Sequence, residues 1–259
     1  MRLASDDEDD LRYAKDLLEN PSLAARVAGA LGKPIEKGIE SLPAGAGEVV
    51  AAATRKSLDA ALAFALASMD DRRRDSVDWG HKLAVAMTGA AGGMFGMTAL
   101  AVELPLSTTI MLRSIADIAR SEGEPIRAPE SKLACLEVFA LGGRLASDDA
   151  TESAYFAVRL ALAKTLAEAA EHLAGRGVTG GGVPVVVRFV SQVAVRFGVP
   201  VSEKLVAQSL PVIGAAGGAL LNAMFIDHFQ DMARGHFIVR RLERAYGREA
   251  VRLAYLQLP

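Results

Sequence analysis

The sequence contains one cysteine, Cys135, and this excludes several kinds of site. A single cysteine cannot form an internal disulfide, and it cannot supply the several thiolates of a structural zinc site. Within the apolar segment ACLEVFAL we expect Cys135 to be a small buried hydrophobic residue, and a nucleophile is the alternative. Aromatic residues make up only 5% of the chain, and the net charge is −2. So small a net charge gives no general field for binding nucleic acid.

The first ten residues also lack the pattern of a secretory signal. They read MRLASDDEDD, with acidic residues where a signal has basic residues followed by an apolar run. We therefore expect a cytoplasmic protein.

The common motifs of catalytic and nucleotide-binding sites are missing as well. The sequence has no G-x-S-x-G elbow, no P-loop and no dinucleotide-binding fingerprint after a strand. Glu168 and His172 lie four residues apart in EAAEHL, but the two histidines of a zinc peptidase motif are not there. We expect no metal and no cofactor.

What the sequence has in abundance is helix-forming residues. Half of the chain is hydrophobic, and alanine and leucine recur at spacings of three and four. This pattern predicts an all-α fold. Helices are expected over 5–20 (with Ser5 as N-cap), 47–69, 131–145, 148–173 and 219–244.

Residues 183–198 are harder to assign. Their β-branched composition favours a strand, but their apolar positions also fit a helix. No other run offers a strand partner, so we predict a helix. The glycine-rich segment 175–184 just before it is a linker within a single domain that spans residues 1–259.

The pentapeptide GAAGG occurs twice, at 89–93 and 214–218, inside the uncharged runs Leu83–Val102 and Leu205–Ile226. A glycine inside a helix costs about 1 kcal/mol relative to alanine, so a compensating contact is needed. Glycines four apart share a helix face and permit close approach of another helix. We expect a single compact multi-helix domain built around these two small-residue-rich segments. Membrane insertion is the alternative, because about 20 helical residues span a bilayer core.

Polar residues are expected within the apolar face of the helix over 219–244. At about 100° per residue, Asn222, His236 and Arg240 fall on a stripe that also carries three phenylalanines. Buried polar groups need partners, and a second helix, with Pro105 in its first turn, presents acids and hydroxyls on one face. The site candidates from the two faces are Glu103, Arg113, Asp117, Asn222, His236 and Arg240.

Two interpretations of this set stay open. It is either a buried network that fixes helix register, with Arg240 paired to Glu103 or Asp117, or a polar ligand pocket inside the helical body. Both require that Arg240 is shielded from water.

Two long segments of the sequence are similar to the EcsC family of bacterial proteins. They are VELPLSTTIMLRSIADIARSEG (102–123) and the segment 196–247, which contains GAAGGALLNAMFIDHFQDMARGHFIVRRLERAYG and is followed by AVRLAYL. The proline of ELP, Asn222 and Arg240 match the family pattern, whereas Glu103 stands where the family often has aspartate. The family is named for a member encoded beside an ABC-transporter pair. The resemblance implies a helical bacterial protein with membrane-related partners, and it supplies no catalytic residues.

These observations favour a non-enzymatic, membrane-associated helical protein. We expect it to bind a lipid-like or apolar ligand, or a membrane protein of the transporter type, from a cytoplasmic position peripheral to the inner membrane. A hydrolase of peptidase-like type, with an internal carboxylate–histidine site, is one alternative. A structural interaction module is another. No nucleic-acid partner is expected.

Overall fold

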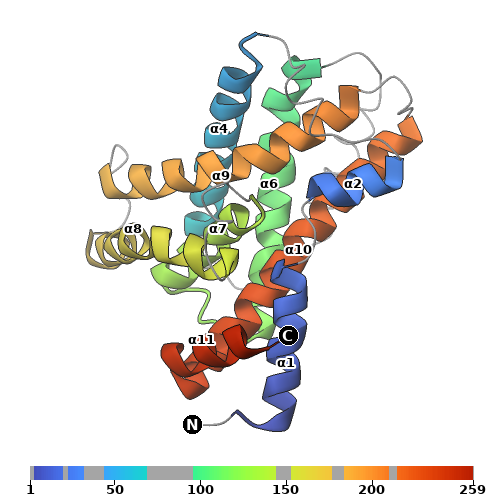
Figure 1. Cartoon of the computed structure of the whole chain (residues 1–259). Coiled ribbons are helices and arrows are strands. Elements are labelled where there is room, and N and C mark those ends of the chain that lie inside the picture. The colour runs from blue at the N-terminus through green and yellow to red at the C-terminus, as the bar shows by residue number, and fades with distance from the viewer. Residues whose placement is uncertain are drawn as a thin grey trace.

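The computed structural model of the chain describes residues 3–19, 23–31, 44–68, 96–143, 153–176, 184–209 and 215–258. Over these residues the fold is all α-helical, with no strand (Figure 1). The all-α prediction is therefore confirmed for the described part of the chain. Its helices are α1 (Ser5–Glu19), α2 (Leu23–Leu31), α4 (Ala46–Ser68), α6 (Gly96–Ser121), α7 (Pro129–Leu141), α8 (Ala154–Arg176), α9 (Pro184–Ser209), α10 (Ala215–Tyr246) and α11 (Arg248–Gln257).

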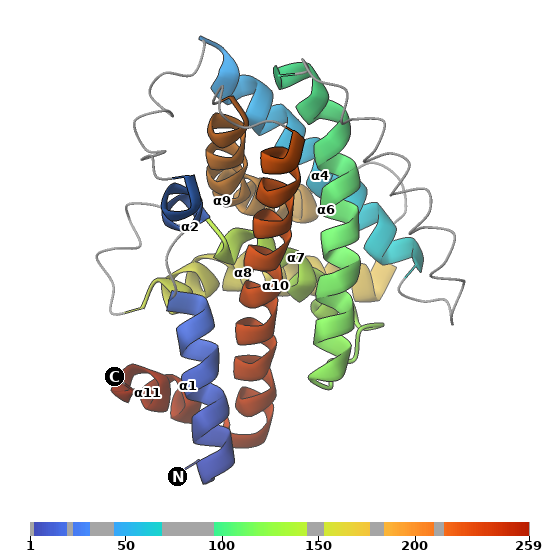
Figure 2. The ribbon, with the colours of Figure 1, turned by 90° about the vertical axis from the view of Figure 1, so that its right-hand side faces the viewer.

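The longest helix, α10, runs through the middle of the molecule. It contacts α1, α2, α6, α7, α9 and α11, and Figure 2 shows it between α1 on one side and α6 on the other. Helices α7, α8 and α9 contact one another, so the segments before and after residues 177–183 pack together. The centre of the core is aromatic, with ring centroids 4.9 Å apart for Phe139 and Phe197 and 5.2 Å apart for Phe225 and Phe229.

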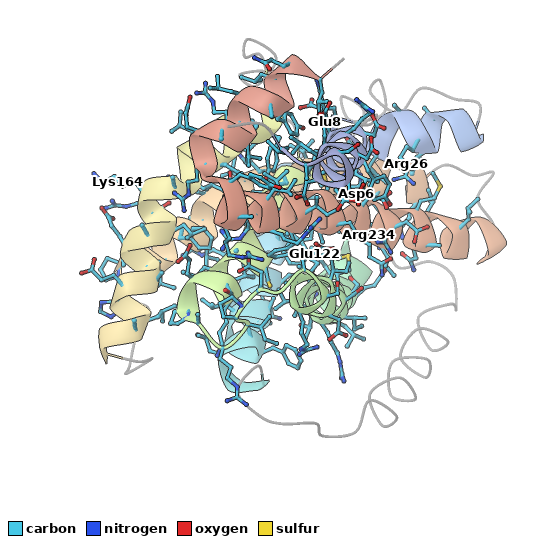
Figure 3. The ribbon with its side chains drawn as sticks, turned by 90° about the horizontal axis from the view of Figure 1, so that it is seen from below. Asp6, Glu8, Arg26, Glu122, Lys164 and Arg234 are labelled. Carbon is cyan, nitrogen blue, oxygen red and sulfur yellow. The ribbon has the colours of Figure 1, made fainter. Side chains whose placement is uncertain are left out.

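Ion pairs attach the N-terminal helix α1 to the side of α10. Arg241 of α10 contacts Asp10 at 2.5 Å and Asp7 at 3.5 Å, and it also pairs with Glu122 after α6 at 2.9 Å. Figure 3 shows Arg234 of α10 and, near it, Glu122 from the turn that follows α6. The acidic start of the chain therefore has a structural partner on α10.

Most of the predicted helices are present with shifted ends. The segment that also resembled a strand, 183–198, is the first part of α9, so that prediction is confirmed. The segments predicted over 131–145 and 148–173 correspond to α7 and α8. Ser5 is the first residue of α1 and not its N-cap, because the carbonyl of Ala4 already accepts the first helical bond, from Glu8, at 2.9 Å.

The prediction that Pro105 lies in a first turn is wrong. Helix α6 begins at Gly96, and Pro105 lies inside it. Proline suits a first turn because its missing N–H is not needed there, but packing against α4 holds the longer helix together. The hydroxyls of Ser107 and Thr109 bond back to the carbonyls of Glu103 and Pro105, at 3.0 and 2.8 Å.

The end of α7 packs closely against α9 next to a second interior proline. Pro200 lies inside α9 and has no N–H to donate to the carbonyl of Arg196, four residues earlier. That carbonyl faces Gly143, where an added Cβ would lie only 1.9 Å from the Arg196 oxygen. The neighbouring Gly142 accepts a hydrogen bond from His228 of α10, with 3.0 Å between its carbonyl oxygen and Nε2. The two glycines after α7 thus allow three helices to meet.

The GAAGG blocks are described only in part. The first block, 89–93, lies outside the described residues, and 215–218 of the second form the first turn of α10. Their role in close helix crossings therefore stays a prediction. Close approach is observed instead at Gly235, where an added Cβ would lie 2.9 Å from the carbonyl oxygen of Ala14 on α1.

The two uncharged runs do not coincide with single helices. The described part of 83–102 is the start of α6, and 205–226 is divided between the end of α9 and the start of α10. Within the described residues, one stretch, Pro184–Gln208 of α9, has the length and apolar composition needed to cross a membrane. The same stretch packs against α4, α7 and α8.

Gly143→Ala should lower the free energy of unfolding by about 1–3 kcal/mol, because the new methyl group meets the Arg196 backbone. Gly175→Ala is the matched control: an added Cβ there has no neighbour within 4 Å, so its stability should be unchanged or slightly raised. Urea denaturation measures both. Equal midpoints for the two variants would contradict the close approach at Gly143.

Candidate ligand-binding pocket

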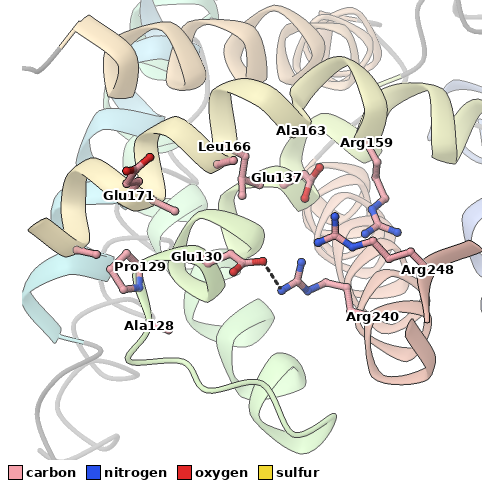
Figure 4. Close-up of a pocket in the computed structure, with 13 residues that line it drawn as sticks. Ala128, Pro129, Glu130, Glu137, Arg159, Ala163, Leu166, Glu171, Arg240 and Arg248 are labelled. Carbon is pink, nitrogen blue, oxygen red and sulfur yellow. Dashed lines mark ion pairs between the residues drawn. The ribbon is translucent and has the colours of Figure 1, made fainter. Parts of the chain in front are cut away.

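A pocket of about 530 Å³ opens between α7, α8, α10 and α11. Figure 4 shows Arg159, Arg240 and Arg248 gathered at one end of it, around the carboxyl group of Glu137. The other end is lined by Pro129 of α7 and Glu171 of α8, and Leu166 lies between the two ends. The pocket therefore has a polar end and an apolar wall.

The apolar wall comes from one face of α8. The lining residues are three or four positions apart, so they project from the same side of the helix. Four of the five apolar lining residues of α8 are alanines, whose small side chains leave space between α8 and α7, and the exposed Glu171 also lines the pocket here. The five are Ala163, Leu166, Ala167, Ala170 and Ala174.

Arg159 of α8 is held in place by two interactions. Its guanidinium donates two parallel hydrogen bonds to the carboxylate of Glu243 on α10, at 2.7 and 2.8 Å. It also lies over the ring of Tyr155, 5.3 Å from the centroid. Burial alone would lower the pKa of Arg159, but Tyr155 and Glu243 outweigh it, and the net shift is upward. The charge of Arg159 is thus fixed and already paired.

Arg240 of α10 forms the second paired cation. Its Nε donates to one oxygen of Glu124 at 2.9 Å and its Nη2 to the other at 3.2 Å. Arg244 and Ser131 also donate to Glu124, which is 1% exposed. Burial would raise the pKa of Glu124, but the bonds from Arg240 and Ser131 and the charge of Arg244 hold it below its ordinary value of 4.5. Glu130 adds a longer contact to Arg240 at 3.6 Å.

Glu137 of α7 is the buried acid of the pocket without a close cation. Its side chain is 4% exposed and lines the pocket, and among the described basic side chains only His236 comes within ion-pair distance, with Nε2 at 3.7 Å. That distance is too long for a hydrogen bond. Burial raises the pKa of Glu137 above its ordinary value of 4.5, and the charges of Arg159, Arg240 and Arg248 offset this only in part. The structure therefore favours the neutral carboxyl, which has an O–H to donate.

His236 lies behind Glu137 and is neutral. Burial, followed by the charges of Arg159 and Arg240, lowers its pKa well below 6.5. The hydroxyl of Tyr155 lies 3.1 Å from Nδ1. Because burial raises the pKa of Tyr155, this hydroxyl keeps its proton and donates to Nδ1. The proton of His236 then lies on Nε2, facing Glu137, where it has no hydrogen-bond partner among the described residues.

Arg248, the first residue of α11, differs from the other two arginines. It is exposed, it lines the pocket, and no carboxylate of the described residues lies within ion-pair distance of it. Its guanidinium is near enough to Glu137 to lower the pKa of that carboxyl. The polar end thus holds two paired arginines, one arginine without an ion pair among the described residues, and a carboxyl whose pKa burial raises.

The structure brings together two of the six residues predicted from sequence. His236 and Arg240 both lie at the polar end of the pocket, and Arg240 is shielded from water, as expected, with a side chain that is 12% exposed. Asn222 lies on the same helix, partly buried, and its Oδ1 has no hydrogen-bond partner among the described residues. Arg113, partly buried, makes no ion pair with any described residue.

The predicted pairing of Arg240 with Glu103 or Asp117 is wrong. Glu103 pairs with the buried Lys204 of α9 at 2.9 Å, and the exposed Asp117 pairs with Arg120 at 2.5 Å. Two contacts show that α6 and α10 run in the same direction: Gln230 with Ser114, and Arg241 with Glu122. Arg240 therefore lies level with the end of α6. At 1.5 Å per residue Glu103 is about 30 Å further back along the helix.

The sequence contains a signal for Glu137, which was not among the predicted site residues. Glu137 is the only charged residue in the apolar segment ACLEVFAL. A lone acid within a continuous apolar run is buried with the run, and it then needs a cation, a proton or a ligand. Arg159, in YFAVRLALA, has the same signature. Arg248 and Glu124 have no such signal, because they lie at a helix start and in a loop.

Metal binding has no support in the described part of the chain, where no three His, Cys, Asp or Glu side chains lie close enough to hold an ion. Cys135 is buried on α7, and burial raises the pKa of its thiol to about 12. A thiol held protonated in this way is not a nucleophile at neutral pH.

Comparison with known proteins places most of the chain in one family. A sequence model of the EcsC protein family matches residues 18–242, which include α2 to α9 and nearly all of α10. No functionally curated protein and no solved structure matches the chain. The family match therefore supports the recognition from sequence and assigns no activity.

Arg240→Ala should lower the free energy of unfolding by about 3 kcal/mol or more, because Glu124 stays buried and loses its two-point ion pair. Arg234→Ala, on the exposed side of the same helix, is the control. It removes only a surface pair with Asp231, worth at most about 1 kcal/mol. Denaturant titration compares them. A loss for Arg240→Ala no larger than the control's would show that the buried pair is not needed for folding.

Glu137→Gln should stabilise the protein at neutral pH and have little effect near about pH 4. In the unfolded chain the carboxyl ionises near its ordinary pKa of 4.5, whereas burial raises the pKa in the folded protein. The wild type therefore loses stability as pH rises from 4.5 through the raised pKa, and glutamine does not. Thermal unfolding across pH measures the difference. A difference in melting temperature that does not grow with pH would contradict the raised pKa.

Proposed function

This chain belongs to the EcsC protein family, and we propose that it is a non-enzymatic binding protein for a lipid-like ligand. The proposal is based on the pocket between α7, α8, α10 and α11, which has guanidinium groups at one end and a largely apolar wall of α8 residues, with Glu171 at its far end. A molecule with an apolar chain and a polar head matches this division.

The size of the pocket supports a small amphiphile. Its volume of about 530 Å³ lies within the range of about 300–1,000 Å³ of ordinary small-molecule sites. The alanines of α8 provide an apolar surface with few rotatable side chains to immobilise, so burying an alkyl chain there gains free energy at low entropic cost. Leu166 adds a larger apolar contact in the middle of the wall.

We also propose that the protein is cytoplasmic and peripheral to the inner membrane. Lipid-like molecules partition into bilayers, so a protein that binds one exchanges it at the membrane surface. A membrane protein of the transporter type is the second kind of partner that fits this position.

A hydrolase with an internal carboxylate–histidine site is the second candidate, and the pair formed by Glu137 and His236 favours it. Glu137 has the raised pKa of a general acid. Against it, His236 is fully buried behind Glu137, and no serine, threonine or cysteine is among the residues that line the pocket. Hydrolysis of p-nitrophenyl decanoate that Glu137→Gln abolishes would favour this candidate over simple binding.

Ala167→Trp should weaken the binding of decanol and of decanesulfonate at least about tenfold, because the indole occupies the space of the alkyl chain. Ala161→Trp is the matched control: Ala161 is exposed on the same helix and does not line the pocket. Isothermal titration calorimetry measures both. Wild-type protein that binds neither probe would overturn the proposed function and favour a structural interaction module, whereas equal binding by the two variants would move the site elsewhere.

A further inference from the structure

We propose that the polar end of the pocket selects a head group with a single negative charge, with Arg248 as its cation and the carboxyl of Glu137 as its hydrogen-bond donor. The inference rests on the proposed function, since it names the chemical class of the ligand that the pocket takes.

Two of the three arginines at the polar end of the pocket have carboxylate partners. Arg159 is neutralised by Glu243. Arg240 and Arg244 share Glu124, and Glu130 adds a second carboxylate to Arg240. Among the three arginines that line the pocket, Arg248 alone makes no ion pair with a described residue. The polar end therefore has one guanidinium without a carboxylate, which matches a ligand with one negative charge.

Glu137 places a buried carboxyl group at the same end of the pocket. Its carboxyl group projects from the middle of α7 to the pocket, among the three arginines (Figure 4). It makes no hydrogen bond in the described structure, and the nearest histidine nitrogen is 3.7 Å away. A buried polar group without a partner has a free energy cost, which a ligand atom in the pocket would remove.

The groups around Glu137 determine what that ligand atom is. Arg159 faces it from α8, His236, Arg240 and Glu243 from α10, and Arg248 from α11. Its own O–H is a donor when the carboxyl is protonated. A negatively charged oxygen can accept a hydrogen bond from this donor and also interact with the guanidinium groups around it. A neutral hydroxyl head group would bind there much more weakly, because its hydrogen bonds carry no ligand charge.

Binding of such an anion is linked to the proton on Glu137. If Glu137 loses this proton, a second negative charge lies beside the ligand and also competes for Arg248. Affinity for a head group that stays ionised at every pH should therefore fall as pH rises through the pKa of Glu137, which burial raises above 4.5. Affinity for a neutral head group should not change in this way.

A singly charged oxygen head on an alkyl chain occurs in two kinds of molecule. One is a single-chain carboxylic acid, and the other is a two-chain phosphodiester lipid such as phosphatidylglycerol. Soluble probes separate the two: decanesulfonate has one chain and stays ionised, and dihexanoylphosphatidylglycerol has two chains. The volume of about 530 Å³ favours the single chain.

The test measures the affinity of decanesulfonate and of decanol for the full chain by calorimetry between about pH 5 and pH 9. Wild-type protein should bind the sulfonate at least about tenfold more tightly than the alcohol at the low end of this range, and the preference should shrink as pH rises. Glu137→Gln keeps a donor of the same size and cannot ionise, so it should bind the sulfonate with little pH dependence.

A second variant keeps the test valid if Glu137→Gln folds poorly. Arg248→Gln should lose about tenfold in sulfonate affinity and keep its affinity for decanol, because the exposed guanidinium contacts only the head group. Arg252→Gln is the matched control on α11, since Arg252 is exposed, pairs with Glu249 and does not line the pocket.

The outcomes separate this inference from the proposed function. Equal binding of decanol and decanesulfonate, or the same pH profile in wild type and Glu137→Gln, would overturn the anion selectivity and leave lipid-like binding intact. Loss of sulfonate affinity in Arg252→Gln as large as in Arg248→Gln would also overturn it. Failure of both probes to bind would overturn the proposed function itself. Tighter binding of dihexanoylphosphatidylglycerol than of decanesulfonate would support selection of a singly charged head group and would identify the ligand as a two-chain lipid.

Discussion

Arg240 has a permanently charged side chain, and it lies within the helical body of the protein. An arginine keeps its proton at any pH the protein meets, so a buried guanidinium requires carboxylates around it. Glu124 supplies such a carboxylate from the loop between α6 and α7. Ser131 of α7 and Arg244 of α10 also donate hydrogen bonds to it. This cluster fixes the end of α6, the start of α7 and the last turns of α10 relative to one another.

The same arrangement sets the chemistry of the pocket. Because Glu124 and Glu243 satisfy Arg240 and Arg159, Glu137 has no cation of its own at bonding distance, and burial then favours its protonated form. The alanines of α8 leave space beside it. The proposed ligand class follows from a buried carboxyl with a raised pKa beside an arginine that pairs with no described carboxylate, at the end of an apolar wall.

Much of the fold followed from sequence periodicity, because local spacing determines which residues share a helix face. It indicated that 183–198 is a helix and that Arg240 and His236 are turned inward. It did not indicate the partner of Arg240, because pairing depends on the relative direction and offset of α6 and α10, and no local pattern encodes these. The burial of Glu137 could be predicted from the sequence, because Glu137 is a lone acid in an apolar run. Arg248 was not, since only the turn at Gly247 brings α11 back to the pocket.

The protonation of Glu137 determines how the polar end of the pocket binds an anion, and nuclear magnetic resonance of protein labelled with carbon-13 at the glutamate side-chain carboxyl measures it directly. The resonance of Glu137 is identified by its loss in Glu137→Gln. We expect a titration midpoint above 4.5 that moves further up when decanesulfonate is added. A midpoint at or below 4.5, or one that does not respond to the anion, would contradict it.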